Sequence, residues 1–101
     1  MSRYPRIKMT VRGEDLGAEI LLYDESRTEY HLLNATARLV WQLCDGSRDV
    51  DEVAAEVSAH FPTVDPERIR RDVEGTIAAL VEKELVVWVT ENAGPGAPGT
   101  G

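Results

Sequence analysis

The sequence predicts an α+β fold of the winged-helix type, with a three-stranded antiparallel sheet followed by three helices and a short C-terminal strand. Apolar and polar residues alternate in the first third of the chain, which is the period of a strand with one face in water. From Asn34 onward the apolar residues recur with helical spacing, and residues 85–89 are again β-prone. With 101 residues, 43% of them hydrophobic, we expect one domain with a modest core.

Three segments in the first third are predicted to be the strands of this sheet. Residues 6–12 alternate strictly between apolar and polar side chains, and residues 18–23 are more apolar. A turn-rich break at residues 13–17 separates these two segments. A short hairpin connection at residues 24–27 then leads into the third segment, residues 28–33.

Each of the three predicted helices begins with a side chain that can accept hydrogen bonds from the free amides of the first turn. These N-caps are Asn34, Asp49 and Asp65, and Asp49 stands in a variant of the capping box. Gly46 is expected to stop the first helix and Pro62 to end the second. The third helix is predicted to be the longest.

Composition limits the partners and the location that we expect. Residues 1–90 are predicted to form the folded domain, and residues 91–101, which alternate Gly and Pro, a disordered tail. The sequence has no membrane-length apolar run and no secretory signal, so we expect a cytoplasmic protein without a membrane partner. A net charge of −7 argues against nucleic acid as a partner, because phosphate binding needs a concentrated positive face.

The residues that usually carry catalysis or bind metals do not form a recognisable pattern. Cys44 is the single cysteine, which excludes an internal disulfide and cysteine-based zinc sites. His31 and His60 lie far apart, and neither has metal-ligand spacing to the other or to Cys44. The acidic residues fall at helix caps and on wet helix faces, and no glycine-rich phosphate loop follows a strand. We therefore expect no enzymatic activity, no cofactor and no metal.

The edges of the predicted sheet are the remaining candidate for function. Residues 28–33 contain no Pro, no Lys and a single charged residue, Glu29, so they carry few of the features that protect an edge strand. An open edge beside an apolar groove can capture an extended peptide as an added strand. The alternative is that another part of the chain covers this edge, or that the strand is short and twisted.

Several short motifs, in their order and spacing, resemble the PqqD-like family. The pattern is an aromatic strand that ends in Leu-Asn, a small helix start, a Val-Trp pair, an Asp-Gly stop, and a Leu-containing exit after the last helix. In this sequence the motifs are residues 30–37 with Leu33-Asn34, Val40-Trp41, Asp45-Gly46, residues 50–53, residues 65–80 and Leu85-Val86. The resemblance covers roughly residues 7–87. One departure is Glu84, where the family commonly has Gly.

Members of that family are recognition elements for ribosomally made peptides that are later modified. The resemblance implies that residues 1–90 bind the leader region of a precursor peptide, which adds to the third strand of the sheet and rests against the third helix. It also implies a partner modifying enzyme, such as a radical-SAM protein or a leader peptidase. The peptide-binding residues are then expected to be Thr28, Glu29, Tyr30, His31, Leu32 and Leu33 on the strand, and Ile69, Arg70, Val73, Glu74 and Ile77 on the helix.

Some of the helix residues have a second interpretation. Ile69, Val73 and Ile77 also fit the apolar stripe that faces the core. The basic cluster at residues 68–71 could meet acidic leader residues or pair with carboxylates along its own helix. Gly75, in mid-helix, could allow close approach of a peptide or of the first helix.

Two other functions remain as alternatives. The same elements are compatible with a winged-helix DNA-binding regulator, although the predicted second helix carries Asp51, Glu52 and Glu56 and no Lys or Arg. Trp88, in the apolar segment after the last helix, either closes the core or marks the surface of a homodimer or of a docked enzyme.

Overall fold

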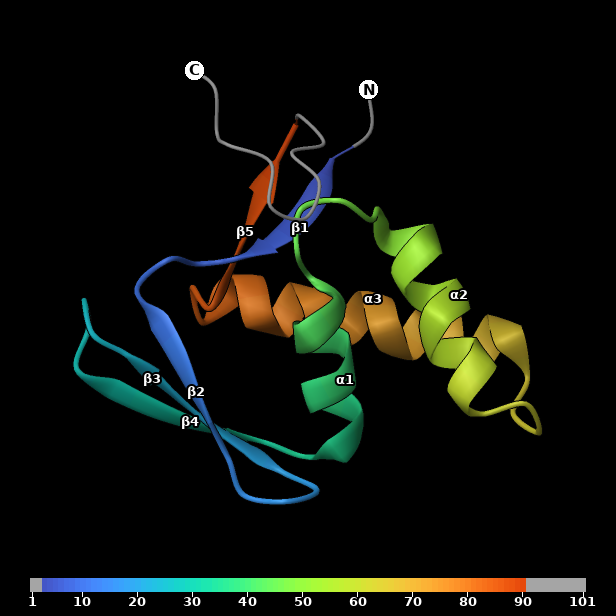
Figure 1. Cartoon of the computed structure of the whole chain (residues 1–101). Helices are drawn as coiled ribbons and strands as arrows, with labels where there is room; N and C mark the ends of the chain where they lie inside the picture. The colour runs from blue at the N-terminus through green and yellow to red at the C-terminus, as the bar shows by residue number, and fades with distance from the viewer. Residues whose placement is uncertain (1–2, 91–101) are drawn as a thin grey trace.

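A computed structural model, which describes residues 3–90, shows that the protein folds into two small sheets and three helices (Figure 1). The predicted tail, residues 91–101, lies outside the described residues. The predicted α+β fold, with its three-stranded antiparallel sheet, three helices and C-terminal strand, is confirmed. The elements in chain order are β1 (Tyr4–Ile7), β2 (Val11–Asp15), β3 (Ile20–Asp24), β4 (Glu29–Leu33), α1 (Ala35–Leu43), α2 (Val50–His60), α3 (Pro66–Glu82) and β5 (Val86–Val89).

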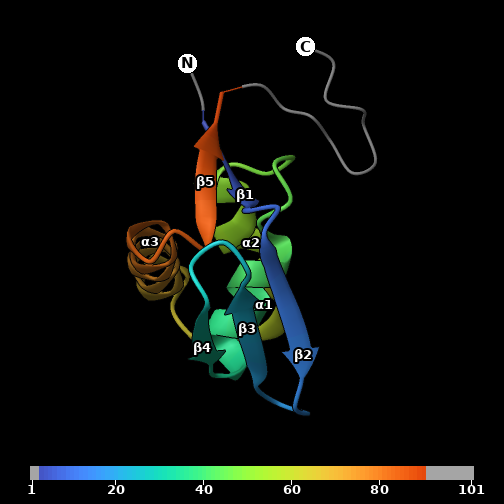
Figure 2. The ribbon, with the colours of Figure 1, turned by 90° about the vertical axis from the view of Figure 1, so that its left-hand side faces the viewer.

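The three-stranded sheet has the order β2-β3-β4, with β3 in the centre, while β1 pairs with β5 in a separate antiparallel ribbon. Figure 2 shows the ribbon at one end of the molecule and the three-stranded sheet at the other. The prediction of a single strand over residues 6–12 is wrong, because the chain turns between Ile7 and Val11. The amide of Val11 donates to the carbonyl of Lys8, and the amide of Lys8 donates to the carbonyl of Leu85. Apolar and polar residues alternate across this turn, from Arg6 to Arg12, so the period alone does not reveal it.

Two further boundaries differ from the sequence prediction. Residues 13–15 belong to β2, not to the predicted break, and the turn follows at residues 16–19. Thr28, predicted to begin the third strand, has a φ of 53° and lies in the hairpin turn before Glu29. A left-handed residue cannot continue the pleated ladder, so the strand starts one residue later.

All three predicted N-caps form. The Asn34 side chain accepts from the amide of Ala37, and the Asp65 side chain accepts from the amide of Glu67. Asp49 and Glu52 form the complete reciprocal capping box, in which each side chain accepts from the backbone amide of the other residue. These hydrogen bonds satisfy amides that have no partner inside the helix, and each such cap is typically worth about 1 kcal/mol.

One hydrophobic core joins the three-stranded sheet to the helices. Its largest fully buried side chains come from the central strand, from α1, α2 and α3 and from the start of β5. They include Leu22, Val40, Val53, Ile77 and Leu85. No helix of the described part of the chain combines the length and the apolar character that crossing a membrane requires.

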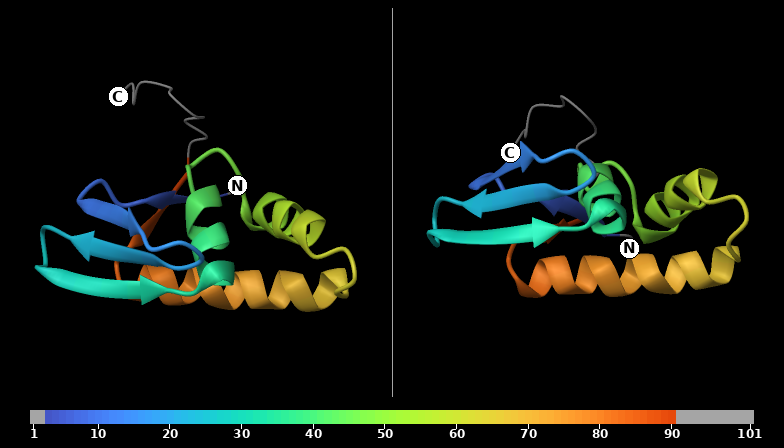
Figure 3. Two further views of the ribbon diagram at one scale, coloured as in Figure 1. Left: turned by 60° about the horizontal axis from the view of Figure 1, so that its bottom comes forward. Right: turned by 90° about the horizontal axis from the view of Figure 1, so that it is seen from below.

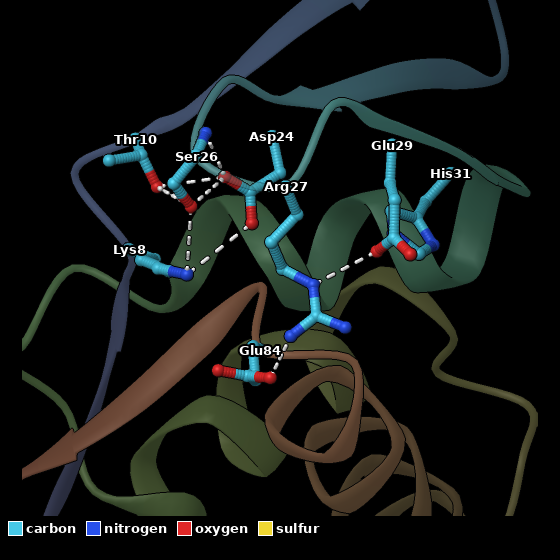
Figure 4. Close-up of polar contacts among 8 residues, drawn as sticks. All are labelled: Lys8, Thr10, Asp24, Ser26, Arg27, Glu29, His31 and Glu84. Atoms are coloured by element: carbon cyan, nitrogen blue, oxygen red, sulfur yellow. Dashed lines mark hydrogen bonds and ion pairs between the residues drawn. The ribbon is translucent and has the colours of Figure 1, made fainter.

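A buried carboxylate holds the β1–β2 connection against the hairpin that leads into β4. The side chain of Asp24, at the end of β3, is fully buried and accepts hydrogen bonds from the hydroxyls of Ser26 (2.7 Å) and Thr10 (2.9 Å). It also accepts from the Ser26 amide (3.0 Å) and pairs with Lys8 Nζ at 3.4 Å (Figure 4). The hydrogen bonds from Ser26, with those from Thr10 and Lys8, lower the pKa of Asp24 from 3.8 to about 2.

We expect the stability that Asp24 provides to depend on pH. Because its folded-state pKa lies below the unfolded value, the contribution is complete above the unfolded pKa of 3.8 and is lost as the pH falls toward about 2. Asp24→Asn should lower the free energy of unfolding near neutral pH, and the difference from the native chain should shrink in acid. Urea denaturation of both proteins at several pH values measures this difference. A difference that stays constant across the acid range would contradict the assignment.

Candidate functional site

Strand β4 is an edge strand. It is hydrogen-bonded to β3 on one side, and no strand within residues 3–90 pairs with its other side. Figure 3 shows the end of β4 beside the C-terminal end of α3, with the two elements pointing in opposite directions. The edge that the sequence predicted to be open is therefore uncovered by any strand of the described chain.

The hydrogen-bond pattern identifies which backbone groups of β4 are free. The amide of Leu16 donates to the carbonyl of Glu19 at the end of the β2–β3 pair, and bonded and non-bonded residue pairs alternate along an antiparallel ladder. The odd-numbered residues of β3 are therefore bonded to β2, and its even-numbered residues to the odd-numbered residues of β4. It follows that Tyr30 and Leu32 direct their N–H and C=O groups to the open edge.

The side chains of β4 divide between two faces. His31 and Leu33 lie on the side that faces the helices, because they pair with buried residues of β3, and Leu33 is only 4% exposed. Tyr30 and Leu32 lie on the outer face and are 66% and 56% exposed. The ring of Tyr30 packs against Tyr23 of β3, with 4.7 Å between the ring centroids. A strand added to this edge would therefore meet an apolar surface on its outer side.

A groove of about 510 Å³ separates the end of β4 and the start of α1 from the face of α3 that runs from Arg71 to Lys83. The N-cap at Asn34 creates the first wall, because the chain turns there from β4 into α1. Leu33, Asn34, Thr36 and Ala37 line this wall. The opposite wall is one face of α3, formed by Arg71, Asp72, Gly75, Thr76, Ala79, Leu80 and Lys83.

The five α3 residues implied by the family resemblance do not line this groove. Ile69, Val73 and Ile77 are buried in the core, at 5%, 1% and 1% exposure, because they form the apolar stripe of the helix. Arg70 faces α2, where it pairs with Asp51, and it also contacts Glu74 on its own helix at 3.4 Å. The groove residues occupy the neighbouring face of α3. Their only sequence signal is the spacing of Arg71, Gly75, Ala79 and Lys83 at intervals of four.

Gly75 has no packing role within the described structure. A Cβ atom placed there would meet no heavy atom within 4 Å, so close approach of α1 does not require the glycine. A glycine inside a helix is less favourable than alanine by about 1 kcal/mol. The groove wall therefore contains an open position, and no contact within residues 3–90 explains why a glycine stands there despite its cost to the helix.

An apolar hollow of about 230 Å³ continues the groove toward α2. It shares Thr36, Asp72 and Thr76 with the groove, so the two surfaces are contiguous. Its remaining lining is mainly aliphatic and aromatic, from Val40, Val57, Phe61, Val64, Ile69 and Val73, with Arg68 also present. Phe61 is 38% exposed, so part of its ring faces solvent.

A cluster of charged residues lies where the β3–β4 turn meets the end of α3 (Figure 4). Arg27, in the β3–β4 turn, pairs with Glu29 Oε1 at 3.0 Å and with Glu84, which follows α3. His31 Nε2 lies 3.6 Å from the same oxygen of Glu29. Glu84 has a φ of 60°, the left-handed conformation that glycine adopts most easily. The departure from the family pattern at this position therefore keeps a backbone geometry suited to glycine.

The groups that could perform chemistry are dispersed. Cys44 is fully buried in the core, and burial raises the pKa of its thiol to about 12, so it is not a thiolate at neutral pH. His60 is exposed and contacts the carbonyl of Glu56 at 3.0 Å. Within residues 3–90 no three side chains of His, Cys, Asp or Glu converge as metal ligands do.

Trp88 is half-buried in β5 and packs against the core. The guanidinium of Arg3 lies over its ring, 4.0 Å from the centroid. Its contact with the core fits the first of the two sequence interpretations.

Two solved structures share this fold. The structure of TbiB1 in complex with the TbiA(beta) leader peptide has a TM-score of 0.74 and 23% identity, over 85% of this chain and 99% of that one. The structure of lasso peptide synthetase B1 complexed with the leader peptide has a TM-score of 0.71 and 22% identity, over 82% of this chain and 96% of that one. No curated protein matches the chain significantly.

The family match covers most of the sheet and all three helices. Residues 19–86 match the family described as Coenzyme PQQ synthesis protein D (PqqD). The matched region contains β3, β4 and α3, and therefore both sides of the groove. The chain belongs to the PqqD family.

Proposed function

We propose that this protein binds the leader region of a ribosomally synthesised precursor peptide as a strand added to β4, and presents it to a modifying enzyme. The observation that carries the proposal is the free edge of β4 beside the α3 groove. Membership in the PqqD family supports it, as do the two structures of the same fold, each of which is a complex with a leader peptide.

The geometry supports capture mainly through the backbone. The N–H and C=O groups of Tyr30 and Leu32 are available to an incoming strand, and main-chain pairing provides affinity. Alternate side chains of that strand point to opposite faces. One set faces the α3 wall, where Gly75 leaves room for a close approach, and the other set lies beside the exposed outer face of β4.

The site residues proposed from the structure differ in part from those that the resemblance implied. The strand residues from Glu29 to Leu33 are retained, and Thr28 lies just before them. On α3, we propose the groove-lining residues in place of the buried Ile77 and of Arg70 and Glu74, which pair with each other. Ile69 and Val73 are buried but line the adjoining hollow. We keep Arg71, Gly75, Thr76, Ala79 and Lys83 as the wall that the peptide contacts.

The partner enzyme completes the proposed function. The protein itself performs no chemistry in this scheme and needs no cofactor; the modification belongs to a partner such as a radical-SAM protein or a leader peptidase in the cytoplasm. DNA binding is less well supported, because the exposed side chains of α2 include Asp51, Glu52 and Glu56.

A proline at a free amide of β4 should abolish binding while leaving the fold intact. Leu32→Pro removes an N–H that faces the open edge, whereas His31→Pro would remove one that is bonded to β3. We expect the affinity of Leu32→Pro for the leader of the precursor encoded beside a modifying enzyme to fall at least about tenfold. Isothermal titration measures the affinity, and circular dichroism checks the fold.

The matched control is Leu32→Ala, which keeps the amide and should bind with nearly native affinity. Native affinity in a folded Leu32→Pro protein would exclude strand addition at this edge.

Substitutions at Gly75 should separate stability from binding. Gly75→Ala should raise the free energy of unfolding by about 0.5–1 kcal/mol, because alanine favours the helix and its Cβ meets nothing. Gly75→Leu should fill the groove and weaken peptide binding without loss of stability. Urea denaturation and titration with the leader peptide measure the two effects.

Ala78→Leu serves as the control, since Ala78 is exposed on α3 but outside the groove lining. Equal binding by the two leucine variants would show that the peptide does not approach Gly75.

A further inference from the structure

The groove contains cations that have no partner within the described chain. Most Lys and Arg side chains of residues 3–90 pair with a carboxylate, and Arg3 lies over Trp88. Arg71 and Lys83 line the groove, Arg68 lines the adjoining hollow, and within residues 3–90 none of these three makes an ion pair. In a chain with 18 acidic and 11 basic residues, unpaired cations would be expected to attract nearby carboxylates. Here they remain exposed along one surface.

The basic cluster at residues 68–71 was expected either to meet acidic leader residues or to pair with carboxylates along its own helix, and Arg70 and Arg71 differ in this respect. Its guanidinium is engaged by Asp51 and Glu74, so it follows the pairing that the sequence allowed. Arg71, one residue later, lines the groove on the adjacent face of the helix, and within residues 3–90 it has no such partner. Pairing within the protein therefore accounts for Arg70 and leaves Arg71 available to a ligand.

The two groove cations lie far apart along the groove. Arg71 and Lys83 are separated by twelve residues, which is about 18 Å along the axis of α3. Lys83 adjoins Glu84, which pairs with Arg27 just before β4. Of the β4 residues, Leu33 lines the groove, and Asn34, Thr36 and Ala37 continue its wall into α1. A peptide that continues from the edge of β4 along this groove would therefore pass both cations.

We infer that the peptide bound by this protein carries two acidic side chains, one meeting Arg71 and the other Lys83. This inference rests on the proposed function and names the chemistry of its ligand. Side chains of a strand face the same way only at even separations, so the two acidic residues lie about six residues apart.

Selection from a peptide library tests the inference about two acidic side chains, and it does not require a known precursor. A displayed library of random peptides of about sixteen residues is long enough to pair with β4 and reach both cations. Selection on the full native chain should recover peptides with Asp or Glu at two positions about six residues apart. Amide chemical shifts of β4, measured by NMR with a selected peptide, report whether that peptide occupies the edge.

Charge reversal gives the matched comparison. The double variant Arg71→Glu with Lys83→Glu should lower the affinity for the selected peptides by about tenfold or more, because two attractions become repulsions. Arg48→Glu with Arg70→Glu makes the same change of net charge at residues outside the groove, and should alter the affinity by less than about twofold. Thermal melting establishes that both variants are folded.

The outcomes distinguish the inference from the function beneath it. Peptides that shift the β4 amides but show no acidic enrichment, or that bind both double variants equally, overturn the inference and leave strand capture standing. Recovery of no peptide that shifts the β4 amides contradicts the proposed function, and the inference falls with it.

Discussion

The burial of alternate side chains along β3 is the constraint on which the rest of the structure depends. Ile20, Leu22 and Asp24 all point toward the helices and are almost completely excluded from solvent. Shifting either neighbouring strand by one residue would exchange its inner and outer faces, so this burial fixes the register of both partners. It also determines that the free backbone groups of β4 belong to Tyr30 and Leu32.

The same constraint explains why the protein can present an edge without exposing its core. Leu33 closes the inner face of β4 just before the chain turns into α1, and Asp24 fixes the opposite end of the hairpin through Thr10 and Ser26. Both ends of β4 are therefore anchored through neighbouring elements. The strand can gain a partner without rearrangement of β3, because the hydrogen bonds to β3 and those available to a ligand come from alternate residues.

Much of the fold could be predicted from local chemistry. Asn34, Asp49 and Asp65 located the helix starts because each side chain replaces a missing backbone partner. The division between β1 and β2 could not be predicted, because the partner of β1 is β5, at the far end of the chain. A long-range pairing of this kind does not change the alternation of apolar and polar residues in either segment.

The candidate site was predictable only in part. The strand residues followed from the scarcity of protective features on residues 28–33 and from the family resemblance. The wall of the groove did not, because the sequence pattern of α3 reports its buried stripe, and the groove lies on the adjacent face. Arg70 and Arg71 illustrate the limit: they are neighbours of identical chemistry, and the structure places one against Asp51 and the other in the groove.

Recognition through backbone groups has a consequence for selectivity. Main-chain pairing discriminates poorly between sequences, so the choice of peptide must come from the side chains around the edge. In this protein those side chains are the groove face of α3, the apolar hollow beside it and the aromatic outer surface at Tyr30. Variation of these surfaces can change the preferred ligand while the hydrogen-bonding edge stays the same.

The burial of Cys44 gives the protein a practical property. Its sulfur is the single thiol of the chain, and it lies inside the core with its Sγ–H directed at the carbonyl of Val40. Dyes and spin labels that react with thiolates should not modify Cys44 in the folded state. A cysteine introduced at the surface could then be labelled selectively in the otherwise native sequence, and energy transfer to a tagged peptide would follow docking and release in real time.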